Sequence, residues 1–456
     1  ILSGLVGSEM CIRDRALIRA DWIVPVASPP LSKGAVLVRD GVIEAVGPTR
    51  SLPPQPGVPE IDLGAVILIP GLIDAHCHLE WALTGGVSPH APFAQWLHGF
   101  AGRSQEFDMA HRERATRWGA LKAMTNGTTT LVDSGPTGAA CTAIGETGQR
   151  GRVHLEAFGR ERGREAMEKA LAVGERVLEL DDSAPPGVEV GVSPHTPYTV
   201  GPEFWHALLE HPELAGRPFA THIAESADEV RLLDEGDGPL GAMFLALGRV
   251  PGQWPARARG PVQRLALNDA LRPGMVAAHC VQVDEMDAMT LGALDVRVAH
   301  CPISNANLHC GDAPVAMLQD AGVVVGLGTD GPASAGPYDL RAEARAAGEA
   351  ARRRGEPRDA ADLLAMATTG SARVIGMQDH LGAIAPGMWA DLVAVAPGDP
   401  ALCDVDVAAA VLDPRSRVTW VMTDGQVRIA NDDHTGVDVA RVIADANQAR
   451  SEMGLD

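Results

Sequence analysis

Residues 71–78 read Gly71-Leu72-Ile73-Asp74-Ala75-His76-Cys77-His78. The stretch is an apolar, strand-like run that ends in two histidines spaced two residues apart. Alternate side chains of a strand share a face, so both imidazoles are expected to point the same way. A lone buried histidine is more often a hydrogen-bonded core residue than a ligand. The pair at a strand end instead predicts a metal site.

Three further stretches place residues that can bind a metal directly after an apolar run. They are Thr221-His222-Ile223-Ala224-Glu225, Ala277-Ala278-His279-Cys280 and Gly328-Thr329-Asp330. If the runs are parallel strands of one barrel, these side chains converge at one end of it. Three imidazoles and one carboxylate suit a single divalent ion, Zn²⁺ or Fe²⁺, and leave room for water. The predicted ligands are His76, His78, His222 and Asp330.

Eight strand-like runs alternate with longer helical patterns in the middle of the chain. Such alternation is typical of repeated βα units and predicts an α/β fold, a closed (β/α)₈ TIM barrel with its active site at the C-terminal strand ends. The predicted strands are residues 71–78, 128–133, 153–158, 188–195, 218–222, 275–279, 296–300 and 323–330. Helical patterns include residues 111–125, 161–180, 202–209 and 339–353.

Short β-type runs separated by Gly, Pro and Ser occupy both ends of the chain, which predicts a small β-sandwich domain built from both ends. A Gly- and Pro-rich stretch, residues 236–261, is predicted to be a long loop after the fifth strand. The expected division is a non-native leader (1–15, whose end resembles translated sequencing adapter), β-sandwich (16–70), barrel hydrolase domain (71–384), β-sandwich (385–430) and a helical tail (431–456).

Glu225 follows His222 by three residues and is expected to stand over the metal without binding it. A metal lowers the pKa of bound water, and a nearby carboxylate can carry a proton from that water to the substrate. The alternative is a glutamate that stabilises a helix N-terminus. His279 is expected to orient the water or stabilise an oxyanion, and Asp330 to bind metal and accept a proton. The predicted catalytic residues are therefore Glu225, His279 and Asp330.

Other polar and aromatic residues at strand ends are candidate substrate contacts. His195 ends the fourth strand, where a purely structural hydrogen bond is the alternative. Glu80 and Trp81 follow the first strand and can form an acidic and aromatic rim for a planar ring, although core packing is the more frequent fate of a tryptophan. Ser304 and Asn305 follow the seventh strand, where a strand-to-loop transition explains their polarity equally well.

The composition limits the class of partner. A formal net charge of -21 over 456 residues disfavours nucleic acid and anionic membrane surfaces, which leaves a small-molecule substrate. Seven cysteines and no CxxC pair favour a reducing compartment. We find neither an apolar run of 18 residues nor a secretory leader, so a cytoplasmic protein is expected. A homo-oligomer, a dimer, is expected from general habit.

The three lysines exclude one alternative metal site. Two metals bridged by a carbamylated lysine would need a lysine at a strand end. Lys33 lies in the first β unit, and Lys122 and Lys169 lie in helical patterns. The sequence therefore predicts a site for one ion.

These motifs, in this order, resemble the amidohydrolase superfamily, in particular its cytosine deaminase and triazine hydrolase branch. The resemblance spans about residues 16–427 and implies metal at the four predicted ligands, with Glu225 and His279 catalytic. His78-Leu79-Glu80-Trp81 and Pro92-Phe93-Ala94-Gln95-Trp96-Leu97 are similar to aminodeoxyfutalosine deaminases. Adenosine and S-adenosylhomocysteine deaminases are close neighbours.

The expected function is hydrolytic deamination of an aminopurine-type or related nitrogen heterocycle, with release of ammonia. A chlorohydrolase or a cyclic amidohydrolase would use the same site with another leaving group. A non-catalytic scaffold is the alternative of a different class, which the loss of a ligand or of Glu225 would have favoured.

Overall fold

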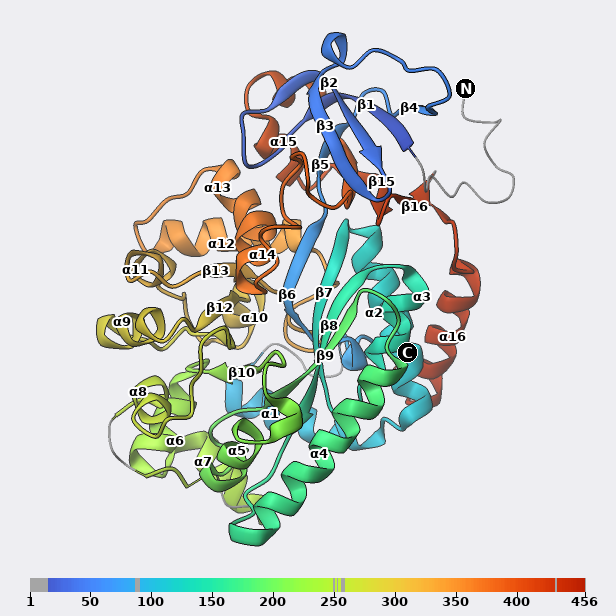
Figure 1. Cartoon of the computed structure of the whole chain (residues 1–456). Coiled ribbons are helices and arrows are strands. Elements are labelled where there is room, and N and C mark those ends of the chain that lie inside the picture. The colour runs from blue at the N-terminus through green and yellow to red at the C-terminus, as the bar shows by residue number, and fades with distance from the viewer. Residues whose placement is uncertain are drawn as a thin grey trace.

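A computed structural model describes residues 15–86, 91–248, 251, 253–255, 259–430 and 433–455. All eight runs predicted as barrel strands form strands (Figure 1). Nearly all of their residues are buried, as expected for parallel strands covered on both faces. The strands are β6 (Leu72–Cys77), β7 (Thr128–Gly135), β8 (Arg150–Ala157), β9 (Val188–Pro194), β10 (Ala220–Ile223), β11 (Val276–His279), β12 (Arg297–His300) and β13 (Val325–Leu327).

The strands form two four-stranded parallel sheets, β6-β7-β8-β9 and β10-β11-β12-β13. Short bridges join the sheets into a barrel at two seams. At one seam Val192 pairs with Phe219, and at the other Cys77 pairs with Asp330. The second seam places Asp330 beside the end of β6, because Asp330 donates its N–H to His76 O and accepts the N–H of His78 on its own carbonyl, both at 3.0 Å.

Helices follow the strands and cover the outside of the barrel. Side chains such as Leu131, Val153 and Val192 face these helices, whereas Val132, Ala220 and Ala299 fill the interior. The helices of the barrel domain include α1 (Phe93–Arg103), α2 (Met109–Thr125), α3 (Ala140–Thr147), α4 (Gly163–Ser183), α5 (Pro202–Leu209), α6 (Ala227–Glu235), α8 (Pro261–Ala266), α9 (Glu285–Ala293), α10 (Pro302–Asn307), α11 (Val315–Asp320), α12 (Leu340–Arg353), α13 (Ala360–Ala365) and α14 (Ser371–Val374).

A third sheet, outside the barrel, lies at one end of it and uses strands from both ends of the chain (Figure 1). Its order is β17-β16-β15-β14-β5-β1-β2-β3, with β4 paired to β1, and Ile18, Leu68 and Leu392 lie in its core. The predicted fold class is confirmed. The strands are β1 (Arg15–Ile23), β2 (Leu31–Arg39), β3 (Val42–Pro48), β4 (Glu60–Asp62), β5 (Ile67–Pro70), β14 (Leu392–Ala396), β15 (Arg417–Thr423), β16 (Gln426–Ala430) and β17 (Asp433–His434).

The predicted loop at residues 236–261 is in part wrong. Gly238–Ala246 forms helix α7, because Pro239 stands in the first turn, where no N–H partner is needed, and Leu240, Met243 and Phe244 form a buried face. Residues 249–250, 252 and 256–258 lie outside the described residues, as do residues 1–14 of the expected leader.

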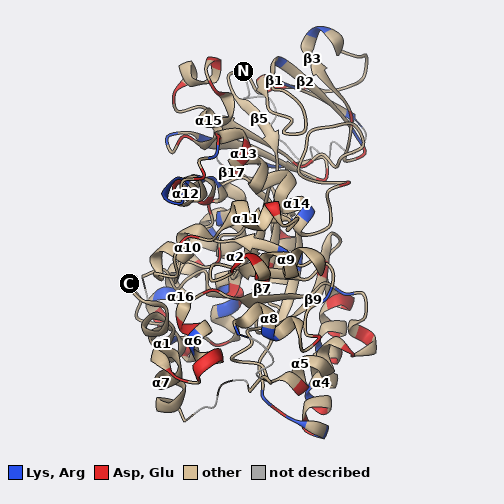
Figure 2. Ribbon diagram, turned by 90° about the vertical axis from the view of Figure 1, so that its left-hand side faces the viewer, with Lys and Arg blue, Asp and Glu red and all other residues tan. Residues whose placement is uncertain are grey.

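The surface and the C-terminal segment complete the fold. Helix α12 carries both Arg and Glu residues (Figure 2). Helix α16 (Val439–Glu452) packs against α2, where Arg114 pairs with Glu452 at 2.7 Å. Within the described ranges, no helix is both long and apolar enough to cross a membrane, and the six cysteines there are buried free thiols.

Candidate active site

The four predicted metal ligands lie together at the C-terminal end of the barrel. His78 Nε2 is 3.2 Å from His222 Nε2 and 3.4 Å from Asp330 Oδ1. His76 Nε2 is 3.9 Å from the same Asp330 oxygen. Atoms that bind one tetrahedral zinc at about 2.0–2.1 Å stand roughly 3.3 Å apart, so these separations fit a shared ion.

The hydrogen bonds of the two facing histidines test whether this donor set suits a cation. His78 Nδ1 contacts the Ser134 carbonyl at 2.6 Å, and His222 Nδ1 contacts the His195 carbonyl at 3.0 Å. A carbonyl accepts, so each neutral ring carries its proton on Nδ1 and presents a bare Nε2. Two lone pairs that face each other at 3.2 Å repel unless a cation lies between them. His76 Nε2 is also buried without a hydrogen-bond partner.

The charge states favour metal binding. Burial, together with the neighbouring histidines, lowers the pKa of His76 and His222 well below the usual value, so both rings stay neutral. Burial alone would raise the pKa of Asp330, but His78, His279 and two serine hydroxyls hold that pKa below its usual value. Neutral imidazoles and an ionised carboxylate are the forms that metals bind.

Glu225 lies beside this cluster, as predicted, and is 6 % exposed. Burial, reinforced by Asp330, raises the pKa of Glu225 well above its usual value, which favours the protonated carboxyl group. Its Oε1 lies 3.6 Å from His279 Nε2, and His279 Nδ1 contacts Asn305 Oδ1 at 2.9 Å. The arrangement can therefore deliver a proton next to a bound ion.

Left-handed backbone turns direct these side chains into the site. Ala224, His279 and Asp330 have φ values of 55°, 74° and 56°. Such φ values cost L residues about 1–3 kcal/mol and are concentrated at functional sites. The turn at Ala224 separates His222 on the strand from Glu225.

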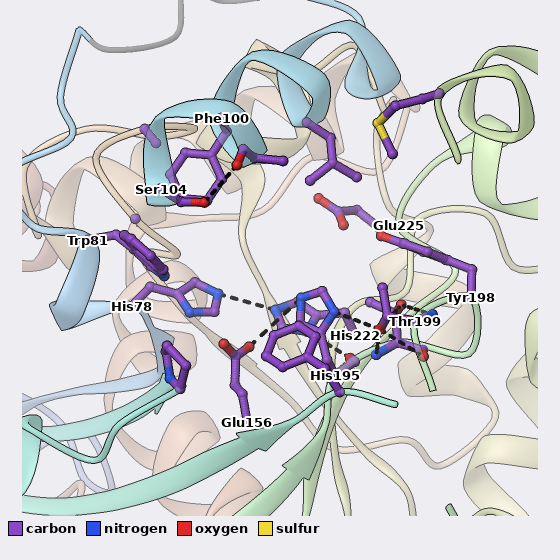
Figure 3. A pocket seen from close by; sticks show the side chains of 18 of the residues that line it. His78, Trp81, Phe100, Ser104, Glu156, His195, Tyr198, Thr199, His222 and Glu225 are labelled. Carbon is purple, nitrogen blue, oxygen red and sulfur yellow. Dashed lines mark hydrogen bonds and ion pairs between the residues drawn. The ribbon is translucent and has the colours of Figure 1, made fainter. Parts of the chain in front are cut away.

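A cavity of about 940 Å³ opens above the cluster. His78, His222, Glu225, His279 and Asp330 lie at its base, and Figure 3 shows Trp81 and His195 on its walls. Its walls are rich in aromatic side chains, which suits a planar ring. The aromatic residues that line it include Trp81, Phe93, Trp96, Phe100, Phe158, Tyr198 and Phe244.

His195 lies where both of the roles considered for it can be compared. Its ring lines the cavity and contacts Thr199 Oγ1 through Nδ1 at 2.9 Å, while its carbonyl orients His222.

Three predicted substrate contacts are placed elsewhere. Glu80 is fully buried and does not line the cavity, because its carboxylate accepts from the N–H groups of Thr137 and Gly138 and from Arg112. Ser304 and Asn305 are also buried away from the cavity. Ser304 donates to Asp330 Oδ2 at 2.6 Å, and Asn305 contacts His279, so both act through another residue.

Glu156 and Arg112 are among the cavity residues that were not predicted from the sequence. Glu156 ends β8 with an oxygen within 4.8 Å of the His78 and His222 nitrogens, and burial raises its pKa to about 7. A glutamate inside the apolar run at 153–158 was a signal for it. Arg112 lies within α2, where the helical pattern offers no such signal.

Comparison with known proteins gives consistent relatives. The amidohydrolase family matches residues 67–428. A 5-methylthioadenosine/S-adenosylhomocysteine deaminase of Desulforudis audaxviator is 31% identical over 426 residues, 91% of this chain and 93% of the relative. The protein of the same name from Symbiobacterium thermophilum is 29% identical over 432 residues, again 91% and 93%.

Solved structures share the architecture. An adenosine deaminase from Xanthomonas campestris with bound zinc superposes with a TM-score of 0.82 at 26% identity, over 97% of this chain and 99% of that one. A zinc complex of atrazine chlorohydrolase from Arthrobacter aurescens has a TM-score of 0.79 at 22% identity, over 95% and 99%, a likeness in fold.

Proposed function

Since this chain belongs to the amidohydrolase family and is a metal-dependent hydrolytic deaminase, we propose that it removes the 6-amino group from an adenine nucleoside with a substituted 5′ arm. The substrate class includes 5′-methylthioadenosine and S-adenosylhomocysteine, which appear in the names of its relatives, and aminodeoxyfutalosine. The observation that carries the proposal is the pair of bare Nε2 atoms of His78 and His222, 3.2 Å apart beneath an aromatic cavity.

We propose that His76, His78, His222 and Asp330 hold one ion. Zn²⁺ is preferred over Fe²⁺ because the adenosine deaminase neighbour carries zinc. A single ion is supported by the positions of the three lysines in β2, α2 and α4, because none of them stands at the end of a barrel strand. When bound, the ion supplies Lewis acidity that makes water nucleophilic near neutral pH.

The side chains around the ion divide the proton transfers. Asp330 accepts a proton from the attacking water, and Glu225 gives its proton to the ring nitrogen beside the amino-bearing carbon. His279, whose Nδ1 donates to Asn305 Oδ1, accepts a hydrogen bond from the attacking water through Nε2 and so orients it. The carbon–nitrogen bond then breaks. The amino group leaves as ammonia after taking the proton held by Asp330, and the added hydroxyl group returns its proton to Glu225 as it becomes the 6-oxo group. Water and nucleoside are thus converted to the 6-oxo nucleoside and ammonia.

The test is ammonia release by zinc-loaded protein with adenosine, 5′-methylthioadenosine, S-adenosylhomocysteine and aminodeoxyfutalosine. We expect turnover of at least one nucleoside, with conversion of its adenine absorbance to that of hypoxanthine. Chloride release from a chlorinated triazine without any deamination would replace the proposal with the chlorohydrolase alternative.

We also propose that the chain forms a homodimer, which light scattering would test.

A further inference from the structure

Arg112 is a cation on the aromatic wall of the cavity. Its side chain is 13% exposed, and its guanidinium carbon lies 4.2 Å from the centre of the Trp81 ring. Trp81 is itself fixed edge-on to Phe100 and Phe107, with ring centres 5.1 and 5.4 Å away. Stacking of this kind holds the plane of the guanidinium group in one orientation.

Only part of this guanidinium group is used inside the protein. Its Nη1 donates to Glu80 Oε2 at 3.1 Å. The other Glu80 oxygen accepts from the Thr137 and Gly138 N–H groups at 2.9 and 3.0 Å. An arginine has five N–H donors. Among the residues the structure describes, none accepts from Nε or Nη2, so those donors are left for solvent or for a ligand in the cavity.

The neighbourhood favours a singly charged ligand group. Ser104 and Gln105 line the cavity on the same side, where Figure 3 places Ser104 beside Phe100 and near Trp81. Carboxylates such as Glu156 and Glu165 outnumber the Arg and Lys side chains among the residues that line the cavity, so a singly charged group is less disfavoured there than a phosphate dianion. A planar carboxylate matches the remaining edge of the guanidinium fork with two parallel hydrogen bonds.

We propose that Arg112 binds a carboxylate at the end of the substrate's 5′ arm, and that this enzyme therefore prefers adenine nucleosides that carry one. The inference rests on the proposed function, because it assumes that the purine lies over the metal cluster. It adds a specificity-determining residue on helix α2.

The experiment compares S-adenosylhomocysteine with its methyl ester, which removes the carboxylate charge and leaves the nucleoside intact. We expect the zinc-loaded enzyme to favour the acid in kcat/KM. Arg112→Met should lower kcat/KM for the acid by about 10- to 100-fold, mainly through KM, since a hydrogen bond to a charged group is lost. The value for the ester should stay within about threefold by the same reasoning.

Lys169→Met is the matched control. Lys169 also lines the cavity and, like Arg112, is paired with a glutamate, Glu161 at 2.7 Å. Its ammonium group has no planar fork for a carboxylate, so this variant should keep the preference for the acid. Equal losses for acid and ester in Arg112→Met would overturn the proposal and leave Arg112 a structural partner of Glu80. Stronger turnover of adenosine 5′-monophosphate than of the acid would overturn the choice of carboxylate.

Titration calorimetry separates this inference from the proposed function. If neither these two compounds nor any other nucleoside of the panel is deaminated, the proposed function fails. An Arg112-dependent difference between their Kd values would still support the carboxylate site, and equal Kd values or no binding would overturn it.

Discussion

Ser304 and Ser334 both donate to one oxygen of Asp330, each at 2.6 Å. They leave the other oxygen directed at His78 and His76. A ligand held in this way loses little freedom when a metal binds, and its carboxylate stays ionised. The two buried hydroxyl groups thus fix the orientation of one proposed ligand.

Ser304→Ala should therefore weaken zinc binding by about 10- to 100-fold, the usual effect of removing a partner of a metal ligand. Competition with a chromophoric chelator measures the Kd directly. Ser183→Ala, at the exposed end of α4, serves as the control and should leave the Kd unchanged. Equal affinity in Ser304→Ala and the wild type would show that Asp330 needs no such support.

Glu225 offers a sharper test at the same scale. Glu225→Gln keeps the size of the side chain but removes the proton that Glu225 is proposed to deliver. Its kcat should fall by about 10²-fold or more, as is typical for the loss of a general acid–base group. Zinc content by mass spectrometry should remain that of the wild type. Unchanged turnover would reject Glu225 as the proton carrier.

At the scale of the element, strand β13 depends on close approach to its neighbours. A Cβ on Gly326 would lie 2.6 Å from Ser371 Cα, and one on Gly328 would lie 2.7 Å from the His76 carbonyl. The spacing of Gly326, Gly328 and Gly331 matches a dinucleotide fingerprint, but two of these glycines serve packing against α14 and β6.

Gly326→Ala should accordingly lower the free energy of unfolding by about 1–3 kcal/mol, the usual cost of overpacking a core. Urea unfolding followed by circular dichroism measures this loss. Gly336→Ala is the matched control, because a Cβ there would meet nothing within 4 Å. A Gly326→Ala variant as stable as this control would contradict the packing role.

The start of helix α6 carries a pH-dependent contact. Glu229 accepts from the N–H groups of Ala224 and Glu225 at 3.2 and 2.8 Å and so braces the turn that presents Glu225. Burial nevertheless raises the pKa of Glu229 to about 8, from its ordinary value of 4.5. The folded chain then binds a proton that the unfolded chain has released between these two values, so stability falls as pH rises through this window.

Glu229→Gln removes this titration while keeping an oxygen that can accept from the backbone. The drop in Tm between pH 6 and pH 8 should be smaller for Glu229→Gln than for the wild type in scanning calorimetry. Parallel Tm profiles would contradict the raised pKa. Glu229→Ala should lower kcat. If Glu229→Gln keeps kcat, the loss in Glu229→Ala comes from the missing hydrogen bonds to the Ala224 and Glu225 N–H groups.

At the scale of the whole molecule, short sequence patterns predicted the features that depend on the order of strands and helices along the chain. Strand ends with ligands at fixed spacing identified the barrel and the cluster of His76, His78, His222 and Asp330. Contacts that do not follow from the common direction of the barrel strands were not predictable. The burial of Glu80 depends on the loop after β7, and the place of Arg112 depends on how α2 lies against Trp81. Such contacts leave no periodic trace in one sequence.

The metal site also joins the two halves of the barrel. His76 lies on β6 and His222 on β10, so the proposed ligands come from both four-stranded sheets, while Asp330 stands at the seam between β13 and β6. An ion bound there would add a cross-link between sheets whose edge strands meet through short β-bridges. Folding and metal binding should therefore be coupled.

Removal of the ion should lower Tm by several degrees. At a free zinc concentration a thousandfold above Kd, binding adds about 4 kcal/mol to the stability of the folded state. Scanning calorimetry of the chelator-treated protein, before and after zinc is restored, measures the change together with the recovery of ammonia release. Asp330→Ala, which lacks one proposed ligand, should respond less to the chelator. A wild-type Tm that is the same with chelator and with zinc would show that the barrel closes without help from the metal.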